Sequence, residues 1–429
     1  MTGAIFNSRK EAYMPYSVEP KYLVMVETKN SGRDNVDHNK YYNMFPDPGG
    51  ATFHVEYGRV GARAMTRVYP ISKWISTYKQ KIDKGYSDNS YLHNGDVSVS
   101  AVSDSDYKEI EDSIVKKLID GLLSFAKNTI RKKYVVKSGE VTEAMIEEAE
   151  SLINSLTFTN NVFDFNYILL KLFKVIPRRM SNVNAYLADS EDDFQKIMFR
   201  EQEVLETMKG QVRADIKLKK TSGSGDSKNE GTILEKMGLE IRECTSSETE
   251  EIKSHMDSDS QKKFKRAFRV VNKETEEKYE KFKKEHHITK RGEKFLYHGS
   301  RNENFWSIIS TGLSLSPNAA ITGKMFGNGI YFAPKAAKSI GYTSSYGFWA
   351  RRGGAKMHDK GYLAVYKVAT GKRFITDDYK SEYSNFTQKN MDRLGCDSFH
   401  AKAGKCLLND EIIVYREDQC TIRYLIEIG

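Results

Sequence analysis

The sequence predicts an α+β protein of several domains: a small β-rich module, an all-helical block and a mixed α+β domain. Three observations predict this order. The chain has 429 residues, more than the roughly 100–200 that one domain usually holds. Strand-like patterns give way to helical spacing after residue 103, and a polar, glycine-rich stretch at 221–231 separates the helical block from the rest.

The composition is that of a globular protein. Hydrophobic residues make up 39% and aromatic residues 11%, which is enough for buried cores and excludes wholesale disorder. The net charge of +9 is modest, so it permits an acidic partner without naming one. Residues 1–16 lack the apolar centre of a signal peptide, and no stretch approaches the roughly 18 apolar residues of a membrane span. We therefore expect a protein that is neither secreted nor bound to a membrane.

The cysteines are too few and too scattered for a disulfide framework. None of them belongs to a C-x2-C pair, so we expect reduced thiols and no metal site. They are Cys244, Cys396, Cys406 and Cys420.

The N-terminal part reads as a loose tail, residues 1–18, followed by a β-rich module, residues 19–103. Loops rich in Asn, Asp, Gly and Pro separate the predicted strands. These strands are Tyr22–Glu27, Lys40–Met44 and Thr52–Tyr57. From Ser72 to Lys84 the spacing becomes helical, with Ile75, Tyr78 and Ile82 on one face.

Residues 104–220 are predicted to be all helical. Apolar residues recur at helical spacing around Leu118 and Met145, and Thr142 is a candidate N-cap for the second of these helices. Phe165–Phe173 and Phe194–Met208 suggest two more. We expect 221–231 to be a linker crossed by few packing contacts.

Residues 232–429 mix strands, turns and helices. The clearest strands are Lys294–Tyr297, Tyr362–Val368, Glu411–Tyr415 and Ile422–Ile428. Candidate functional residues stand at four places in this domain, and each place alone has an ordinary structural explanation. These places are Tyr297-His298-Gly299-Ser300, the glycine-rich run Gly323–Ala333, Lys338-Ser339-Ile340-Gly341-Tyr342 and Leu407–Tyr415.

Together, and in this order and spacing, the four segments resemble the catalytic domain of the poly(ADP-ribose) polymerase family. The resemblance implies an ADP-ribosyltransferase fold built on an antiparallel β core. It also implies that NAD+ is the substrate, that no metal is needed, and that ADP-ribose is transferred to protein acceptors, including the enzyme itself. Cleaving the nicotinamide–ribose bond creates an oxocarbenium-like centre, so such a site must stabilise positive charge.

The resemblance also implies roles for individual residues. The backbone of Gly299 and the hydroxyl of Ser339 bind the nicotinamide amide, and Tyr331 and Tyr342 sandwich its ring. His298 binds the adenine-side ribose. Ser300 and Asn304 lie near the nucleotide.

Glu411 is the expected catalytic residue. The matching glutamate in the family hydrogen-bonds the 2′-hydroxyl of the nicotinamide ribose and orients a sugar acceptor. His298, Tyr331 and Glu411 together form the set associated with polymer-forming members. The sequence departs from the family at Ser314, where many members have an arginine, and in its short 370–406 segment.

The β-rich module resembles the family's WGR domain, with Tyr57 in place of the namesake tryptophan. From Tyr57 to Lys84 there are seven basic residues and one acid, a composition that suits phosphate contact. By resemblance, Asn39, Tyr57 and Arg59 contact DNA, including strand breaks or ends. A solvated basic face on a small fold is the alternative. The block 104–220 resembles the regulatory, autoinhibitory helical domain of the family.

Two other functions remain open on these residues: a mono-ADP-ribosyltransferase or NAD+ hydrolase, and a non-catalytic DNA-binding protein on an inactive transferase fold. The resemblance implies a nuclear location in a eukaryote and a cytoplasmic one otherwise.

Overall fold

The computed structural model describes residues 18–28, 37–93, 107–222, 231–315, 325–345 and 360–429. The chain divides into two compact units, Met1–Asn94 with Asn182–Asn184, and Gly95–Ser181 with Ala185–Gly429. The expected tail, 1–18, and linker, 221–231, lie largely outside the described residues. No helix among the described residues is both long and apolar enough to span a bilayer.

The first unit is an antiparallel sheet with one helix. Its strand order is β4-β3-β2-β1-β5. The elements are β1 (Lys21–Glu27), β2 (His38–Pro46), β3 (Thr52–Arg59), β4 (Met65–Pro70), α1 (Trp74–Asp83) and β5 (Ser87–Asp88). Trp74 of α1 packs edge-on against Phe53 at 4.9 Å between ring centroids, which joins the helix to the sheet.

The structure confirms the three predicted strands and the helix of this unit, with two differences. Strand β4 was not predicted, because most of its side chains are exposed and it therefore carries no alternating apolar pattern. Ile82 is exposed on α1, although its spacing predicts the buried face.

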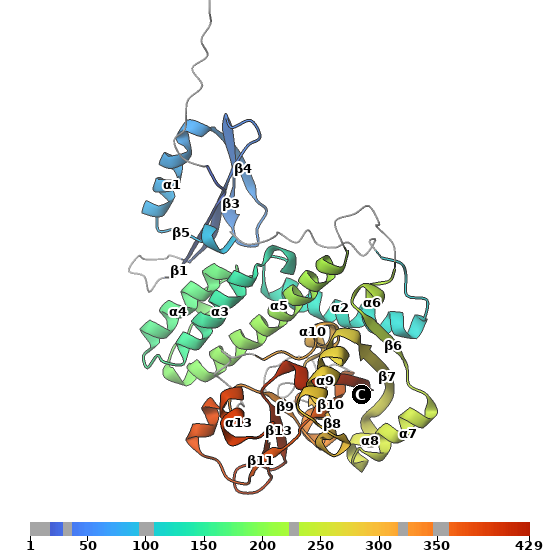
Figure 1. The fold of residues 1–429 in the computed structure, drawn as a ribbon. Helices are drawn as coiled ribbons and strands as arrows, with labels where there is room; N and C mark the ends of the chain where they lie inside the picture. Colours follow the sequence, from blue (N-terminus) through green and yellow to red (C-terminus); the bar gives the residue numbers. More distant parts are fainter. Residues whose placement is uncertain (1–17, 29–36, 94–106, 223–230, 316–324, 346–359) are drawn as a thin grey trace, which may run out of the picture. The chain divides into compact units, whose positions relative to one another are not determined.

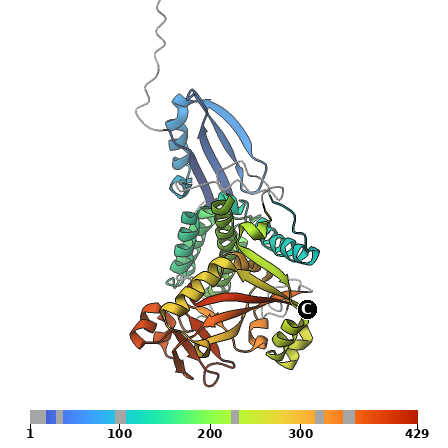
Figure 2. The ribbon, with the colours of Figure 1, turned by 45° about the vertical axis from the view of Figure 1, so that its right-hand side comes forward.

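Four helices open the second unit: α2 (Ser113–Lys133), α3 (Glu143–Leu156), α4 (Val162–Val175) and α5 (Phe194–Ser222). The N-cap predicted at Thr142 is confirmed, since its hydroxyl accepts from the Met145 amide at 3.2 Å. Helix α5 runs well beyond the predicted Met208, because the sparse apolar residues Val212, Ala214 and Leu218 are all buried. Figures 1 and 2 show α3, α4 and α5 gathered on one side of the sheets that follow.

Two sheets form the rest of the unit. The five-stranded one has the order β6-β7-β14-β10-β8 and is antiparallel throughout. Its strands are β6 (Leu239–Glu243), β7 (Phe264–Asn272), β8 (Glu293–Gly299), β10 (Gly361–Ala369) and β14 (Cys420–Ile428). The four-stranded sheet, in the order β11-β12-β13-β9, is antiparallel except for the pair β11–β12. It contains β9 (Ile330–Phe332), β11 (Arg373–Thr376), β12 (Ser398–Ala401) and β13 (Glu411–Val414).

Short helices surround these sheets: α6 (Ile233–Lys236), α7 (Ser246–Ser254), α8 (Ser258–Lys263), α9 (Lys273–Glu285), α10 (Phe305–Thr311), α11 (Ala336–Ile340) and α13 (Gln388–Leu394). The architecture confirms the predicted mixed α+β class with an antiparallel core. The four strands predicted for this region are also confirmed.

One hydrophobic core joins the helical block to the sheets. Leu122 of α2 and Leu218 of α5 belong to the same buried cluster as Trp306, Leu425 and Val414. The expectation that few packing contacts link the helical block to the rest is therefore wrong. The apolar face of α5 is covered by the sheet domain, so the two parts form one compact unit.

Candidate functional site

The two sheets of the second unit meet where β8 and β9 touch. Tyr297 and Ala333 exchange both backbone hydrogen bonds, at 2.9 and 3.0 Å. On the other side of β9, Tyr331 pairs with Ile413 of β13. This pairing brings together the end of β8, the strand β9 and the start of β13, three segments far apart in the sequence.

His298 lies at the end of β8, beside this junction. Its Nδ1 is 3.0 Å from the carbonyl oxygen of Tyr331, so Nδ1 carries the proton and Nε2 is left as an acceptor. Burial lowers the pKa of His298. The ring is therefore neutral at pH 7, a polar group rather than a cation.

Tyr331 on β9 is held by both functions of its hydroxyl. The hydroxyl donates to the Gly327 carbonyl at 2.9 Å and accepts from the Phe326 amide at 3.0 Å. Gly327 has φ +81° and a Cβ there would lie 2.2 Å from the Phe386 carbonyl oxygen, so only glycine fits this turn. The aromatic ring of Tyr331 is consequently fixed in place.

Glu411 is the first residue of β13 and is 9% exposed. Its carboxylate pairs with the ammonium of Lys338 at 2.5 Å, and Lys338 also donates to the Asn409 carbonyl at 3.2 Å. Burial, and then the charge of Glu411, raise the pKa of Tyr342, which lies close by. Glu411 is thus a buried, paired carboxylate, and the solvated alternative does not hold.

Gly299 and Ser339 touch where β8 passes α11. A Cβ on Gly299 would lie 1.8 Å from the Ser339 carbonyl oxygen. The Ser339 hydroxyl donates to the Tyr297 carbonyl at 3.0 Å, which leaves its lone pairs as acceptors. Tyr342, two turns of chain away, is half exposed.

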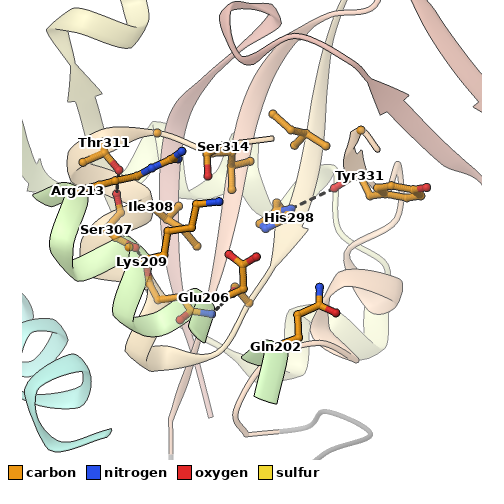
Figure 3. A pocket seen from close by; sticks show the side chains of 17 residues that line it. Gln202, Glu206, Lys209, Arg213, His298, Ser307, Ile308, Thr311, Ser314 and Tyr331 are labelled. Carbon is orange, nitrogen blue, oxygen red and sulfur yellow. Dashed lines mark hydrogen bonds between the residues drawn. The ribbon is translucent and has the colours of Figure 1, made fainter. Parts of the chain in front are cut away.

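A cavity of about 300 Å³ lies on the other side of His298 (Figure 3). It brings together four of the predicted residues, His298, Ser300, Asn304 and Tyr331. Gly299, Ser339, Tyr342 and Glu411 do not line it. The predicted residues therefore fall into two groups, one around the cavity and one around Glu411, with His298 and Tyr331 between them.

Helix α5 forms one wall of this cavity, which sequence reasoning missed. Its lining residues recur at helical spacing and so share one face. They are Gln202, Glu206, Lys209, Gly210 and Arg213. The Thr207 hydroxyl donates to the side-chain oxygen of Asn304 at 3.0 Å, and a Cβ on Gly210 would lie 2.4 Å from the Ser307 hydroxyl. The glycine thus allows α5 to approach α10 closely.

Lys338 was also missed as a site residue. It belongs to the Lys338–Tyr342 segment, and its basic character beside a predicted catalytic glutamate was the available signal. Ser314, the departure from the family pattern, lines the cavity as well.

In the first unit, the predicted DNA contacts differ in exposure. The side chain of Asn39 is fully buried in β2, while that of Arg59 is 40% exposed and interacts with Asp37 at 3.5 Å. Tyr57 is partly buried, 5.6 Å from Tyr42 between ring centroids.

Positive charge gathers beside these tyrosines. The ammonium of Lys81 lies 3.7 Å from the centroid of the Tyr42 ring. Burial lowers the pKa of Lys81, and the nearby charges of Lys84 and Lys40 lower it further. Like charges held this close together favour a polyanionic partner.

The cysteines are unpaired. Among the described residues, no group of three or more His, Cys, Asp and Glu side chains is placed to hold a metal ion.

Comparison with known proteins agrees with this geometry. Residues 246–429 match the model of the poly(ADP-ribose) polymerase catalytic domain. Protein 101L of Invertebrate iridescent virus 6 is 32% identical over 197 residues, which cover 45% of this chain and 78% of that protein. The putative poly [ADP-ribose] polymerase-like protein 100L of the same virus is 32% identical over 144 residues, 32% of this chain and 70% of that protein. Human poly [ADP-ribose] polymerase 2 is 29% identical over 159 residues, 31% of this chain and 26% of the human protein.

The fold, the junction of β8, β9 and β13, and these matches define an NAD+ ADP-ribosyltransferase. The chain belongs to the poly(ADP-ribose) polymerase family, and NAD+ is its substrate.

The close approach at Gly299 is testable. In Gly299→Ala the new Cβ meets backbone on the Ser339 side, so β8 or α11 has to move, and we expect a lower melting temperature. Gly121→Ala in α2 is the matched control, since nothing lies within 4 Å of its Cβ and alanine is favoured over glycine in a helix by about 0.5–1 kcal/mol. Thermal unfolding of both variants measures the difference. Equal stability of the two would contradict the packing described.

Proposed function

We propose that this chain builds poly(ADP-ribose) on protein acceptors, itself included, and that DNA, such as strand breaks or ends, stimulates the reaction. The observation that carries the catalytic part is the buried, paired Glu411 beside Tyr331 and Tyr342, at the junction of the two sheets. A mono-ADP-ribosyltransferase or NAD+ hydrolase would share this site, and product length on a gel separates these activities from polymer formation.

The nicotinamide end of NAD+ lies, in this proposal, between Tyr331 and Tyr342. The backbone of Gly299 approaches the amide closely because it has no side chain. The Ser339 hydroxyl accepts from the amide through its remaining lone pair. Two aromatic faces orient the flat ring without adding charge, which leaves the developing cation to Glu411.

Glu411 hydrogen-bonds the 2′-hydroxyl of the nicotinamide ribose and stabilises the oxocarbenium-like transition state. Lys338 pairs with the carboxylate and so favours its charged form. When a polymer is extended, the same carboxylate orients the acceptor hydroxyl. The adenosine end lies in the cavity with His298, Ser300 and Asn304.

Glu411→Gln should abolish polymer formation while NAD+ still binds, because it removes a charge needed mainly in the transition state. Loss of one preorganised electrostatic group costs about 10²–10³ in rate. Glu427→Gln is the matched control, a carboxylate of similar exposure that pairs with Lys360 at 3.7 Å on β14. Polymer is measured with labelled NAD+ on a gel. A Glu411→Gln protein that makes long polymer at the wild-type rate would show that the catalytic residue is misassigned.

The DNA-binding part rests on the basic and aromatic surface of the first unit. Arg59 and the cluster of Lys40, Lys81 and Lys84 supply positive charge, and Tyr57 lies next to Tyr42 under Lys81. Asn39 is buried, so we assign it the role of holding β2 in register beside Arg59, with which its neighbour Lys40 pairs.

Arg59→Ala should weaken DNA binding and reduce DNA stimulation. Each phosphate contact removed should lower the log–log dependence of affinity on salt by roughly 0.9 for duplex DNA. Fluorescence anisotropy with a nicked duplex at several salt concentrations measures both. Lys21→Ala, which removes a cation outside the 57–84 segment, is the control. Affinity that responds neither to salt nor to Arg59→Ala would rule out a DNA-binding role.

Regulation by the helical block is supported by the position of α5 against the cavity. Beyond the lining residues, Glu203 accepts from Arg301 at 2.7 Å and Lys217 donates to the Ser310 carbonyl at 2.7 Å. Ligand sites for drug-sized molecules span about 300–1,000 Å³, so the cavity is at the small end for a dinucleotide. We propose that DNA favours a state in which α5 moves away and the cavity widens.

Releasing α5 by substitution tests this proposal in the full-length chain. Glu203→Gln with Lys217→Met weakens both clasps without touching the cavity lining, and should raise NAD+ turnover in the absence of DNA by roughly tenfold, which corresponds to about 1.4 kcal/mol. Lys196→Met, on the exposed face of α5, serves as control. If the double variant is no faster without DNA than the wild type, α5 does not restrain the enzyme.

A further inference from the structure

The charged groups of the cavity are arranged unevenly. Its titratable side chains are Glu206, Lys209, Arg213, His298 and Tyr331. Lys209 is already paired with Glu150 of α3, and His298 is neutral at pH 7 because burial lowers its pKa. Of the cations that line the cavity, Arg213 is therefore the one whose charge is left for a ligand.

The guanidinium of Arg213 has no protein partner to satisfy it. Within the part of the chain that the structure describes, no hydrogen bond or ion pair joins it to another residue. The side chain is partly buried and extends into the cavity on the side where Thr311 and Ser314 lie, while Glu206 and Gln202 lie farther along α5 (Figure 3). Removing a guanidinium from water without giving it an acceptor is costly, which favours a bound anion at this end.

The fold holds Arg213 in this place. Its neighbours on α5, Val212 and Ala214, are buried, and Lys217 one turn on is fixed by Glu274 at 2.9 Å and by the Ser310 carbonyl. The backbone that carries Arg213 is thus anchored on both sides, so the guanidinium is positioned before a ligand arrives.

We propose that Arg213 binds the diphosphate of NAD+, so that the helical block contributes directly to the substrate site. This inference rests on the proposed use of the cavity for the adenosine end. A guanidinium presents paired donors that match phosphate oxygens, and the other end of the cavity, with Glu206, repels phosphate. The diphosphate lies toward Thr311 and Ser314, and the nucleoside lies toward Asn304 and Ser300.

Binding of three ligands to the full-length, DNA-free protein tests this assignment by calorimetry. ADP-ribose and ADP carry the diphosphate, and adenosine does not. Arg213→Gln should weaken ADP-ribose and ADP by about 10- to 100-fold, the range for a hydrogen bond to a charged group, and leave adenosine unchanged. Arg213→Lys should restore part of the loss, since it keeps the charge and loses the fork.

Lys220→Gln is the matched control, because it removes one positive charge from the exposed last turn of the same helix. It should leave all three affinities unchanged. In turnover, Arg213→Gln should raise KM for NAD+ with little change in kcat, because the diphosphate is bound alike in the ground and transition states. Melting temperatures of the variants show that each is folded.

The outcomes separate this inference from the proposed function. Wild-type protein that binds ADP-ribose and fails to cleave NAD+ would overturn the function and leave Arg213 assigned. Protein that cleaves NAD+, with ADP-ribose affinity unaltered by Arg213→Gln, would overturn the assignment alone. An equal loss for adenosine and ADP would also overturn it, since the effect would then come from the shape of the cavity.

Discussion

The site depends on the two backbone hydrogen bonds between Tyr297 and Ala333. They join a five-stranded and a four-stranded sheet that otherwise have separate strand orders. Because His298 follows Tyr297 and β9 precedes Ala333, the same pairing sets the distance from the His298 ring to the Tyr331 carbonyl. Pairing of β9 with β13 then carries the constraint to Glu411. A catalytic arrangement from three distant segments is thus fixed by main-chain geometry, which tolerates side-chain change better than packing does.

A second constraint is the hydrophobic core that α2 and α5 share with the sheets. Such a core makes α5 part of the transferase unit, although it lies outside the segment that matches the catalytic-domain model, residues 246–429. Moving α5 as a rigid body would expose Ala214 and Leu218, at a free-energy cost that grows with the apolar area exposed. A modest shift or local opening at the cavity end of the helix costs less, because Gln202 and Glu206 are polar.

The sequence predicted most of the fold because its strands and helices carry regular apolar patterns. Strand β4 and the second half of α5 escaped prediction for opposite reasons: β4 buries little, and α5 buries its few apolar residues against a partner far away in the sequence. The motif residues of the site were predicted from a resemblance, and their mutual distances were not. Neither the ion pair of Lys338 with Glu411 nor the wall made by α5 has a local signature, since both depend on contacts between distant segments.

Helix α5 carries two separate demands on two faces. One face supplies Ala214 and Leu218 to the core, and the other presents Glu206, Lys209 and Arg213 to the cavity. On the proposed function, any motion that widens the cavity also withdraws the guanidinium of Arg213 from the diphosphate. DNA and NAD+ are then linked through the position of one helix, and linkage requires the effect to be reciprocal. A DNA-bound state with α5 displaced gains room for the dinucleotide and loses one phosphate contact, so its net NAD+ affinity reflects the difference between these two terms.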